Sequence, residues 1–419
     1  MMLELTIDRP AQGGRMIARD PSGGPQGAGA IVLVSGAIPG ERVRVRVTER
    51  RHGVAFAETI EVLEPSPDRR DPPFDPLCGG NLLAHITYAR QLELKREMLA
   101  DAFRRQARME LTALPPIAGS PETGYRMRAR LHMTGGRLGF YRERSKDVCD
   151  AARTGQLSEG ASGVIEAAGA ALAPVADVIE EIVLAENAAA DTRVLHVVLS
   201  GAASPSSLEP LGLVPGVSGV TASEISGSVA PILGQFVIGE RLPGGALVER
   251  HAASFFQANR FLLAELVTKV IDATGTGPVA DLFAGVGVFA VEAASRGRKV
   301  VAVESDRVSG GDLRSNLESF GDDARAMTQP VEAWLRAASP GDEYGAVIVD
   351  PPRAGLATDV RAALIGLLPR RIVYVSCDPV TLARDVKEFV AAGYRLVQLE
   401  ALDLFPNTPH VESIAVLEA

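Results

Sequence analysis

The feature that most constrains the fold is the alternation of apolar strands and helical segments from about His251 to the C-terminus. The apolar runs GPVADLF, KVVAVES, YGAVIVD and RIVYVSC are each followed by a segment with helical spacing. Strands and helices that alternate in this way form a parallel sheet with helices on both faces. The closing segments YRLVQLEALDLF and HVESIAVLEA are close enough to pair as a hairpin, which would place one antiparallel strand in the sheet. We therefore expect an α/β, doubly wound, Rossmann-like catalytic domain over residues 251–419.

The first 66 residues have the pattern of a small β-barrel. In IVLVSGAIPGERVRVRVTERR apolar and polar residues alternate, and IPGE marks a turn between two strands. The valines of this run point to one face, and Arg42, Arg44 and Arg46 point to the other. The pattern predicts a barrel with a basic outer face that could contact RNA.

Residues 67–250 mix helical and strand patterns, which predicts an α+β middle domain. The proline- and charge-rich EPSPDRRDPPFDP is typical of a linker, and a helix is expected over 88–108 with its charges away from the apolar stripe. We expect this helix to pack on the catalytic domain. A hairpin with a central Gly-Gly turn follows, and the alanine-rich stretch 159–190 favours helix. The hairpin region carries a second group of arginines, Arg126, Arg128 and Arg130.

Composition limits the class of protein. The 419 residues carry a net charge of −9, which argues mildly against a nucleic-acid partner unless basic residues cluster locally. No apolar run approaches a membrane span, and the N-terminus lacks the pattern of a signal peptide. Three cysteines are too few for a disulfide framework and fit a reducing compartment. We expect a cytoplasmic protein without a membrane partner, and a monomer.

A candidate cofactor pocket follows the first strand of the catalytic domain. In DLFAGVGVFA, Gly285 and Gly287 allow a ligand close to the backbone, and the helix that begins there offers free N–H groups. The next strand ends in Glu304, where a carboxylate can accept hydrogen bonds from ribose hydroxyls. The GxGxxG spacing of a dinucleotide site is absent. The pattern favours S-adenosylmethionine, with NAD as the alternative.

Two further segments place reactive groups at the same edge of the sheet. Asp350 ends a strand in IVDPPRAGL, where two prolines stiffen the loop, and Arg353 favours a polar or anionic ligand. Cys377 ends the strand RIVYVSC, and its position alone suits either a buried apolar residue or a reactive thiol.

A thiol beside a methyl donor suits methylation of uracil at C5. A thiolate that adds to C6 makes C5 nucleophilic, and a base must then remove the C5 proton. Glu412, which begins the last expected strand, can supply that base.

The motifs SFFQANRF, DLFAGVG, VVAVES, IVDPPRAGL, YVSCDPVTLARD and DLFPNTPHVE occur in the order found in RNA 5-methyluridine methyltransferases, which the whole chain resembles. The resemblance implies a TRAM module of OB-like fold at the N-terminus and an rRNA or tRNA substrate. It also implies roles for the candidate site residues. Cys377 would be the nucleophile and Glu412 the base, Arg353 would lie at the substrate, and the methyl donor would contact Gln257, Phe283, Gly285, Gly287, Glu304 and Asp350.

The chain departs from this family at an expected iron–sulfur site. Many relatives carry four cysteines there, whereas this chain keeps Cys78 and has Pro72, Asn81 and Thr154 at the other positions. Cys149 is out of register with the fourth position. Because a cubane cluster normally needs four thiolates, we expect no iron–sulfur cluster and no metal, with Cys78 packed in a loop.

Two alternative functions remain open on the sequence. The chain could methylate another position, such as cytosine C5 or a base nitrogen, although a nitrogen target would need no thiol. It could also be an RNA-binding protein without activity. Survival of nucleophile, base and donor pocket in one chain favours the uracil enzyme.

Overall fold

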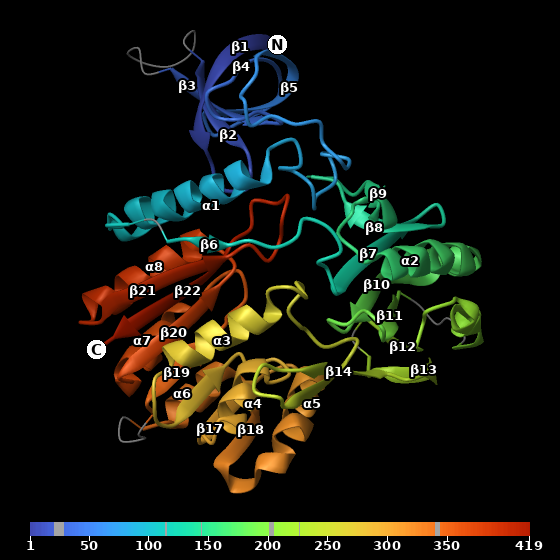
Figure 1. Cartoon of the computed structure of the whole chain (residues 1–419), viewed down its shortest axis with the longest axis vertical. Helices are drawn as coiled ribbons and strands as arrows, with labels where there is room; N and C mark the ends of the chain where they lie inside the picture. The colour runs from blue at the N-terminus through green and yellow to red at the C-terminus, as the bar shows by residue number, and fades with distance from the viewer. Residues whose placement is uncertain (21–28, 114, 144, 201–204, 226, 340–343) are drawn as a thin grey trace.

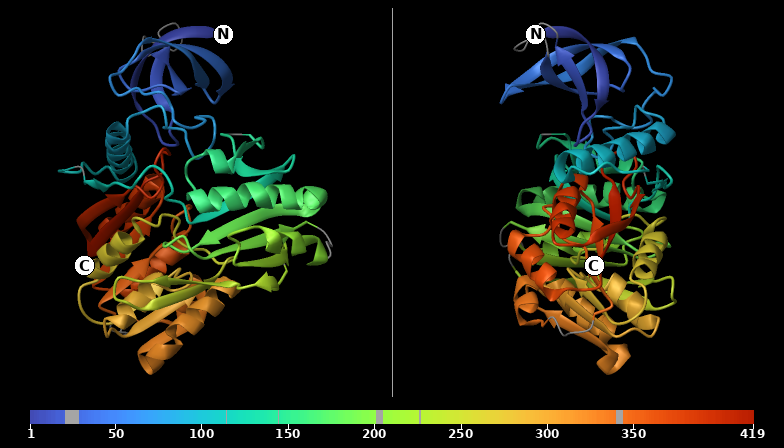
Figure 2. Two further views of the ribbon diagram at one scale, coloured as in Figure 1. Left: turned by 45° about the vertical axis from the view of Figure 1, so that its right-hand side comes forward. Right: turned by 90° about the vertical axis from the view of Figure 1, so that its left-hand side faces the viewer.

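The computed structural model of the chain describes residues 1–20, 29–113, 115–143, 145–200, 205–225, 227–339 and 344–419. Within these ranges the strands form a closed barrel, a seven-stranded sheet, an eight-stranded sheet and a separate hairpin. Figures 1 and 2 show the barrel at one end of the molecule, with helix α1 lying between it and the eight-stranded sheet.

The barrel is built as the alternating pattern predicts. Its strands run in the order β1-β2-β3-β5-β4, and β4 closes the barrel on β1. Val43 and Val45 are fully buried inside it, and the arginines that alternate with them lie on the outer surface. The strands are β1 Met2–Pro10, β2 Met16–Asp20, β3 Ala30–Ser35, β4 Arg42–Arg51 and β5 Val54–Glu64.

The middle sheet has the order β13-β12-β11-β10-β7-β8-β9. The Gly-Gly hairpin is confirmed, since Thr134 of β7 pairs with Arg137 of β8. The helix expected over 159–190 is shorter in the structure, where α2 covers Glu159–Leu172. A 3-10 helix with Pro174 near its start follows α2. The run after it is rich in β-branched residues and forms β10. The strands are β7 Arg128–Thr134, β8 Arg137–Tyr141, β9 Val148–Asp150, β10 Ile179–Glu186, β11 Arg193–Leu199, β12 Gly219–Glu224 and β13 Ala230–Gly234; the separate hairpin is β14 Val237–Arg241 and β15 Leu247–His251.

The segment Glu159–Val178 is 20 residues long and apolar enough to cross a membrane by length and composition. The sequence patterns had indicated no such segment. In the fold, α2 packs Val164, Ile165 and Leu172 into the core of the middle sheet. Its apolar face is therefore used within the protein.

The catalytic sheet has the order β18-β17-β16-β19-β20-β22-β21-β6. Strands β16 to β20 are parallel, and β22 is antiparallel to both β20 and β21, which confirms the antiparallel strand expected from the closing hairpin. The strands are β16 Val279–Leu282, β17 Val300–Glu304, β18 Ala324–Thr328, β19 Ala346–Val349, β20 Arg371–Ser376, β21 Arg395–Leu402, β22 Glu412–Glu418 and β6 Ile117–Ala118.

Helices cover both faces of this sheet, so its central strands β17, β16, β19 and β20 are almost entirely apolar. One buried cluster joins the sheet to α3, α4 and α5, and the other joins it to α6, α7, α8 and the end of α1. The helices are α3 Leu263–Ala273, α4 Val288–Ser295, α5 Arg307–Leu317, α6 Val331–Ala337, α7 Thr358–Leu367 and α8 Pro379–Ala391.

Helix α1, Tyr88–Ala102, continues into a π-helical turn, Phe103–Ala107, and links two cores. Leu94 belongs to the core of the barrel, whereas Leu99 and Phe103 belong to a core of the catalytic sheet. The helix therefore packs on the catalytic sheet as expected. The expected segregation of its charges is wrong, because Lys95 is fully buried. Strand β6 also joins the catalytic sheet although it lies within 67–250, so the domain limits stay a prediction.

Candidate active site

The topology brings four of the predicted site residues to one edge of the catalytic sheet. Strands β17, β16, β19 and β20 are neighbours, and their carboxyl ends point the same way. Glu304 is the last residue of β17, while Phe283, Asp350 and Cys377 directly follow β16, β19 and β20. Ligands of open α/β sheets bind at this edge, between strands whose helices leave to opposite faces.

The glycine turn after β16 is held by Glu304. The N–H of Gly285 donates to Glu304 Oε2 at 2.8 Å, and the N–H of Asp306 donates to Oε1 at 2.6 Å. Gly287 adopts φ +94°, and a Cβ there would lie 2.6 Å from Leu313 Cδ1, so any other residue would be strained at this position. The two carboxylate oxygens have about four acceptor sites in all, which leaves capacity for ligand hydroxyls.

Asp281, within β16, is a buried acid that the sequence patterns did not single out. Its Oδ2 accepts from the N–H of Ala290 in α4 at 3.0 Å, and Oδ1 has no partner among the described residues. Burial, with the nearby charge of Asp350 second, raises its pKa well above the ordinary value. Asp281 ties the start of α4 to the strand and so fixes the turn at Gly285. An acid inside an otherwise apolar strand was the signal available in the sequence.

Asp350 directly precedes two prolines in the sequence and contacts Gln257. Gln257 Nε2 donates to Asp350 Oδ2 at 3.3 Å, so the segment SFFQANRF does reach the strand edge. Burial raises the pKa of Asp350 to about 7. A carboxyl of this kind can hold or accept a proton near neutral pH.

Cys377 and Glu412 lie opposite each other across two antiparallel strands. Ser376, the last residue of β20, pairs with Ser413, so Cys377 and Glu412 both lie next to this pair, and the charge of Glu412 acts on the Cys377 thiol. The pKa of the Cys377 thiol is raised to about 12, first by burial and then by the charges of Glu412 and Asp350, against a lowering by Arg353. Burial, followed by the charge of Asp350, raises the pKa of Glu412 well above its ordinary value. The site thus concentrates three acidic groups that do not all ionise together.

This arrangement predicts how Cys377 reacts with iodoacetamide as pH changes. A raised pKa keeps the thiol protonated at neutral pH, so labelling should still accelerate above pH about 9, where an ordinary thiol levels off. Replacing Glu412 with Gln removes one of the charges that oppose ionisation and should speed labelling at that pH. The rates are measured by mass spectrometry of the Cys377 peptide. A plateau near pH 9 in the native protein, unchanged in E412Q, would contradict this account.

Arg353 lies at the mouth of the site. Its side chain is 63% exposed, and its Nε lies 3.5 Å from Asp378 Oδ2. Asp378 also caps α8 by accepting from the N–H groups of Val380 and Thr381. The guanidinium is therefore anchored at one end and open to an incoming ligand.

Comparison with known proteins decides the family. Over 92% of its length the chain is 34% identical to the 23S rRNA (uracil(1939)-C(5))-methyltransferase RlmD of Alkalilimnicola ehrlichii, of which the match covers 91%. The chain belongs to the RNA 5-methyluridine methyltransferase family. Family models for tRNA (uracil-5-)-methyltransferase and the TRAM domain match residues 341–419 and 2–60.

Two further known proteins match over the whole chain. An uncharacterized RNA methyltransferase of Thermotoga maritima is 29% identical, covering 100% of this chain and 99% of its own. The crystal structure of Pyrococcus abyssi tRNA (uracil-54, C5)-methyltransferase with S-adenosyl-L-homocysteine matches with a TM-score of 0.78 at 27% identity, covering 99% of both chains.

The expectation of a basic outer face on the TRAM barrel is wrong. Each arginine has glutamates beside it on neighbouring strands: Arg42 pairs with Glu64 at 3.0 Å, Arg46 with Glu58 at 3.2 Å, and Arg44 with both Glu4 and Glu61. The alternation of valine and arginine along the sequence correctly predicted that the arginines lie on the outside of the barrel. The strand register then set acids opposite them, so this strand face carries paired charges of both signs.

The second arginine group also does not form one exposed face. The guanidinium of Arg126 lies 4.9 Å and 5.3 Å from the ring centroids of Phe140 and Phe405. Arg128 lies over Phe255 and donates to the carbonyl of Ser254, and burial lowers its pKa to about 10. Arg130 is exposed and pairs with Glu181 at 3.0 Å. Arg126 instead connects the middle domain to the segment before Glu412.

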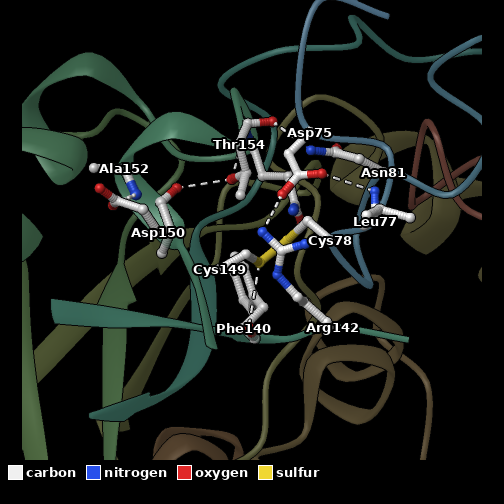
Figure 3. The surroundings of a disulfide bond; sticks show 12 residues. Asp75, Leu77, Cys78, Asn81, Phe140, Arg142, Cys149, Asp150, Ala152 and Thr154 are labelled. Atoms are coloured by element: carbon white, nitrogen blue, oxygen red, sulfur yellow. Dashed lines mark hydrogen bonds and ion pairs between the residues drawn. A yellow bond between two sulfur atoms is a disulfide. The ribbon is translucent and has the colours of Figure 1, made fainter. Parts of the chain in front are cut away.

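Cys78 and Cys149 form a disulfide, which the expectation of unpaired cysteines missed (Figure 3). Their Cα atoms are 5.7 Å apart, and the two residues are 0% and 5% exposed. Asn81 Nδ2 donates to the carbonyl of Thr154 at 3.4 Å, so two of the replaced cluster positions lie side by side. The residues present do not fit a four-thiolate cluster, because this place offers two sulfurs that are bonded to each other.

Proposed function

We propose that this enzyme transfers the methyl group of S-adenosylmethionine to C5 of a uridine in RNA, through a covalent bond between Cys377 and C6. The observation that carries the proposal is the register of β20 and β22: Ser376 pairs with Ser413, next to Cys377 and Glu412, and the charge of Glu412 acts on the Cys377 thiol. Asp350 lies close enough for its charge to act on both groups. A nitrogen-methylating enzyme would have no use for this thiol.

The side chains of the site divide the steps of the reaction between them. A stacked base cannot reach the strand edge, so the uracil must be flipped out of its RNA. The sulfur of Cys377 adds to C6, and its proton passes to a carboxylate such as Asp350, whose pKa lies near 7. S-adenosylmethionine supplies the electrophilic methyl group that C5 takes. Glu412 then removes the C5 proton, and the released electron pair expels the Cys377 thiolate.

Glu304 is proposed to hold the methyl donor, together with Gln257, Phe283, Gly285, Gly287 and Asp350. Replacing Glu304 with Ala should weaken binding by about 1–3 kcal/mol, the loss typical of a hydrogen bond to a charged group. The affinity is measured by titration calorimetry with S-adenosylhomocysteine. Glu318→Ala changes an exposed acid in the helical turn that follows α5 and leads to the start of β18, at the opposite edge of the sheet; it is the control and should bind as the native protein does. An unchanged affinity in E304A would remove Glu304 from the site.

The RNA class is proposed from the relatives, which act on 23S rRNA or on tRNA by name. The test is mass spectrometry of nucleosides from rRNA and tRNA of a deletion strain, mapped to position. Loss of 5-methyluridine from either RNA supports the proposal. Loss of 5-methylcytidine instead would support the cytosine reaction, and no loss in either RNA would favour a binding protein. We place the protein in the cytoplasm, where both RNAs are found, as a monomer.

We further propose that the enzyme carries no iron–sulfur cluster and that the disulfide holds the Cys78 segment instead. Thiol titration of the denatured protein should find one free thiol, that of Cys377, and three after reduction. The preparation should be colourless. Stoichiometric iron and sulfide after anaerobic purification would overturn the proposal, as would three thiols without a reductant.

A further inference from the structure

Helix α1 buries two polar side chains against the segment that carries the proposed base. Gln91 and Lys95 are one helical turn apart and are both 0% exposed. They face residues 403–411, which precede Glu412 and are called here the base loop. The contact joins an N-terminal helix to the last turn before the final strand, as Figure 1 shows where α1 crosses above β21 and β22.

Lys95 contacts the beginning of the base loop. Its Nζ donates to Asp403 Oδ1 at 2.5 Å and to the carbonyl of Phe405 at 3.1 Å. Asp403 Oδ1 also accepts from the N–H of Phe405 at 3.2 Å, so the ammonium and the loop backbone share one carboxylate oxygen. Lys95 thereby sets the direction in which the loop leaves β21.

Gln91 contacts the middle of the base loop both as a hydrogen-bond donor and as an acceptor. Its Nε2 donates to Asn407 Oδ1 at 2.9 Å, and its Oε1 accepts from the N–H of Asn407 at 2.9 Å. Asn407 has φ +63°, a conformation that needs local support in a residue other than glycine. The pair of bonds supplies that support.

The base loop is also held from the donor side of the site. Asn259 Nδ2 donates to the carbonyl of Leu404 at 3.0 Å, and Asn259 lies two residues after Gln257, which contacts Asp350. The loop is thus held between α1 and the segment that reaches the donor pocket. Four residues lie between Asn407 and Glu412, so a shift of the loop moves the start of β22.

A buried lysine–aspartate pair is a poor source of stability, because desolvating both charges cancels most of their attraction. Apolar residues of similar size often stabilise a fold equally well. Displacing one partner of such a pair leaves a buried charge unpaired, which is strongly unfavourable. This property suits a segment that must place one carboxyl accurately.

We propose that Lys95 and Gln91 are positioning residues that hold the Glu412 carboxyl where it removes the C5 proton. The inference rests on the proposed function, because it takes Glu412 as the base. Neither residue touches RNA or the methyl donor in this account, so both act through Asp403 and Asn407.

The test uses the double variant Lys95→Met/Asp403→Leu, which removes the pair without leaving a buried charge, and the milder Gln91→Met. The substrates are unmodified transcripts of 23S rRNA and tRNA with S-adenosylmethionine. We expect methyl transfer in the first turnover to persist, while release of methylated RNA slows at least about tenfold, part of the contribution of a general base. The conjugate of Cys377 with RNA should therefore accumulate on denaturing gels, with KM little changed.

The matched control is Lys269→Met/Glu400→Leu, which removes another lysine–carboxylate pair between a helix and β21, with Nζ 2.6 Å from Glu400 Oε2. It should release product at the native rate. Native release in K95M/D403L and Q91M would overturn the inference, and so would equal losses of adduct formation and release in a protein that still binds donor. E412Q is the reference variant. If E412Q traps no conjugate, the proposed function itself is wrong. If E412Q traps the conjugate but the α1 variants release product at the native rate, only the positioning role is wrong.

Discussion

Replacing Cys377 with Ala is expected to abolish methylation of RNA while leaving the affinity for S-adenosylhomocysteine unchanged. Without the sulfur no bond to C6 can form, and C5 of uracil is too weakly nucleophilic to take the methyl group. The loss should be roughly 10³-fold or more, as for other enzymes that lose their nucleophile. The measurement is transfer of a labelled methyl group to unmodified transcripts of 23S rRNA and tRNA, with calorimetry on the same preparation.

The other two cysteines provide the control for this result. The double variant Cys78→Ala/Cys149→Ala removes the disulfide and leaves Cys377 in place. It should keep methyl transfer, though with lower thermal stability, since a cross-link across 71 residues of chain is lost. Measurable methylation by C377A, or a loss of the same size in the control, would show that Cys377 is not the nucleophile.

Replacing Glu412 with Gln is expected to trap a conjugate of Cys377 with RNA when S-adenosylmethionine is present. The thiol can still add to C6 and the methyl group can still be transferred, but the amide cannot take the C5 proton. Release should slow by about 10²–10⁴-fold, the usual contribution of a general base. The conjugate is seen as a shifted band after denaturing electrophoresis and is located on Cys377 by mass spectrometry.

Two controls make this second result specific. Glu418→Gln changes an acid at the far end of the same strand, where it pairs with Arg371, and should turn over normally. RNA containing 5-fluorouridine should trap the native enzyme as well, because fluorine cannot leave as a proton does. A conjugate that also forms with C377A would rule out the assigned steps.

Much of the catalytic domain could be predicted because its signals are local. A strand is apolar over four to eight residues, and the residue that follows it lies at the sheet edge whatever the rest of the chain does. This reasoning placed Glu304, Asp350 and Cys377 on one edge, and the topology confirms that their strands lie in one parallel run, β17-β16-β19-β20. The antiparallel β22 followed from the short connection before Glu412, and the barrel interior followed from the alternating valines.

What the sequence alone determined, then, is the periodic part of the protein: which residues face a core, and which end a strand at the ligand-binding edge. The tertiary structure decided which polar groups meet, because partners far apart in sequence leave no local pattern. Lys95 meets Asp403 across 308 positions, and its burial contradicts the usual position of a lysine on a helix. Arg44 looked like part of a basic face until the strand register set Glu4 and Glu61 beside it. Cys78 likewise looked unpaired, because only the folded middle domain brings Cys149 within bonding distance.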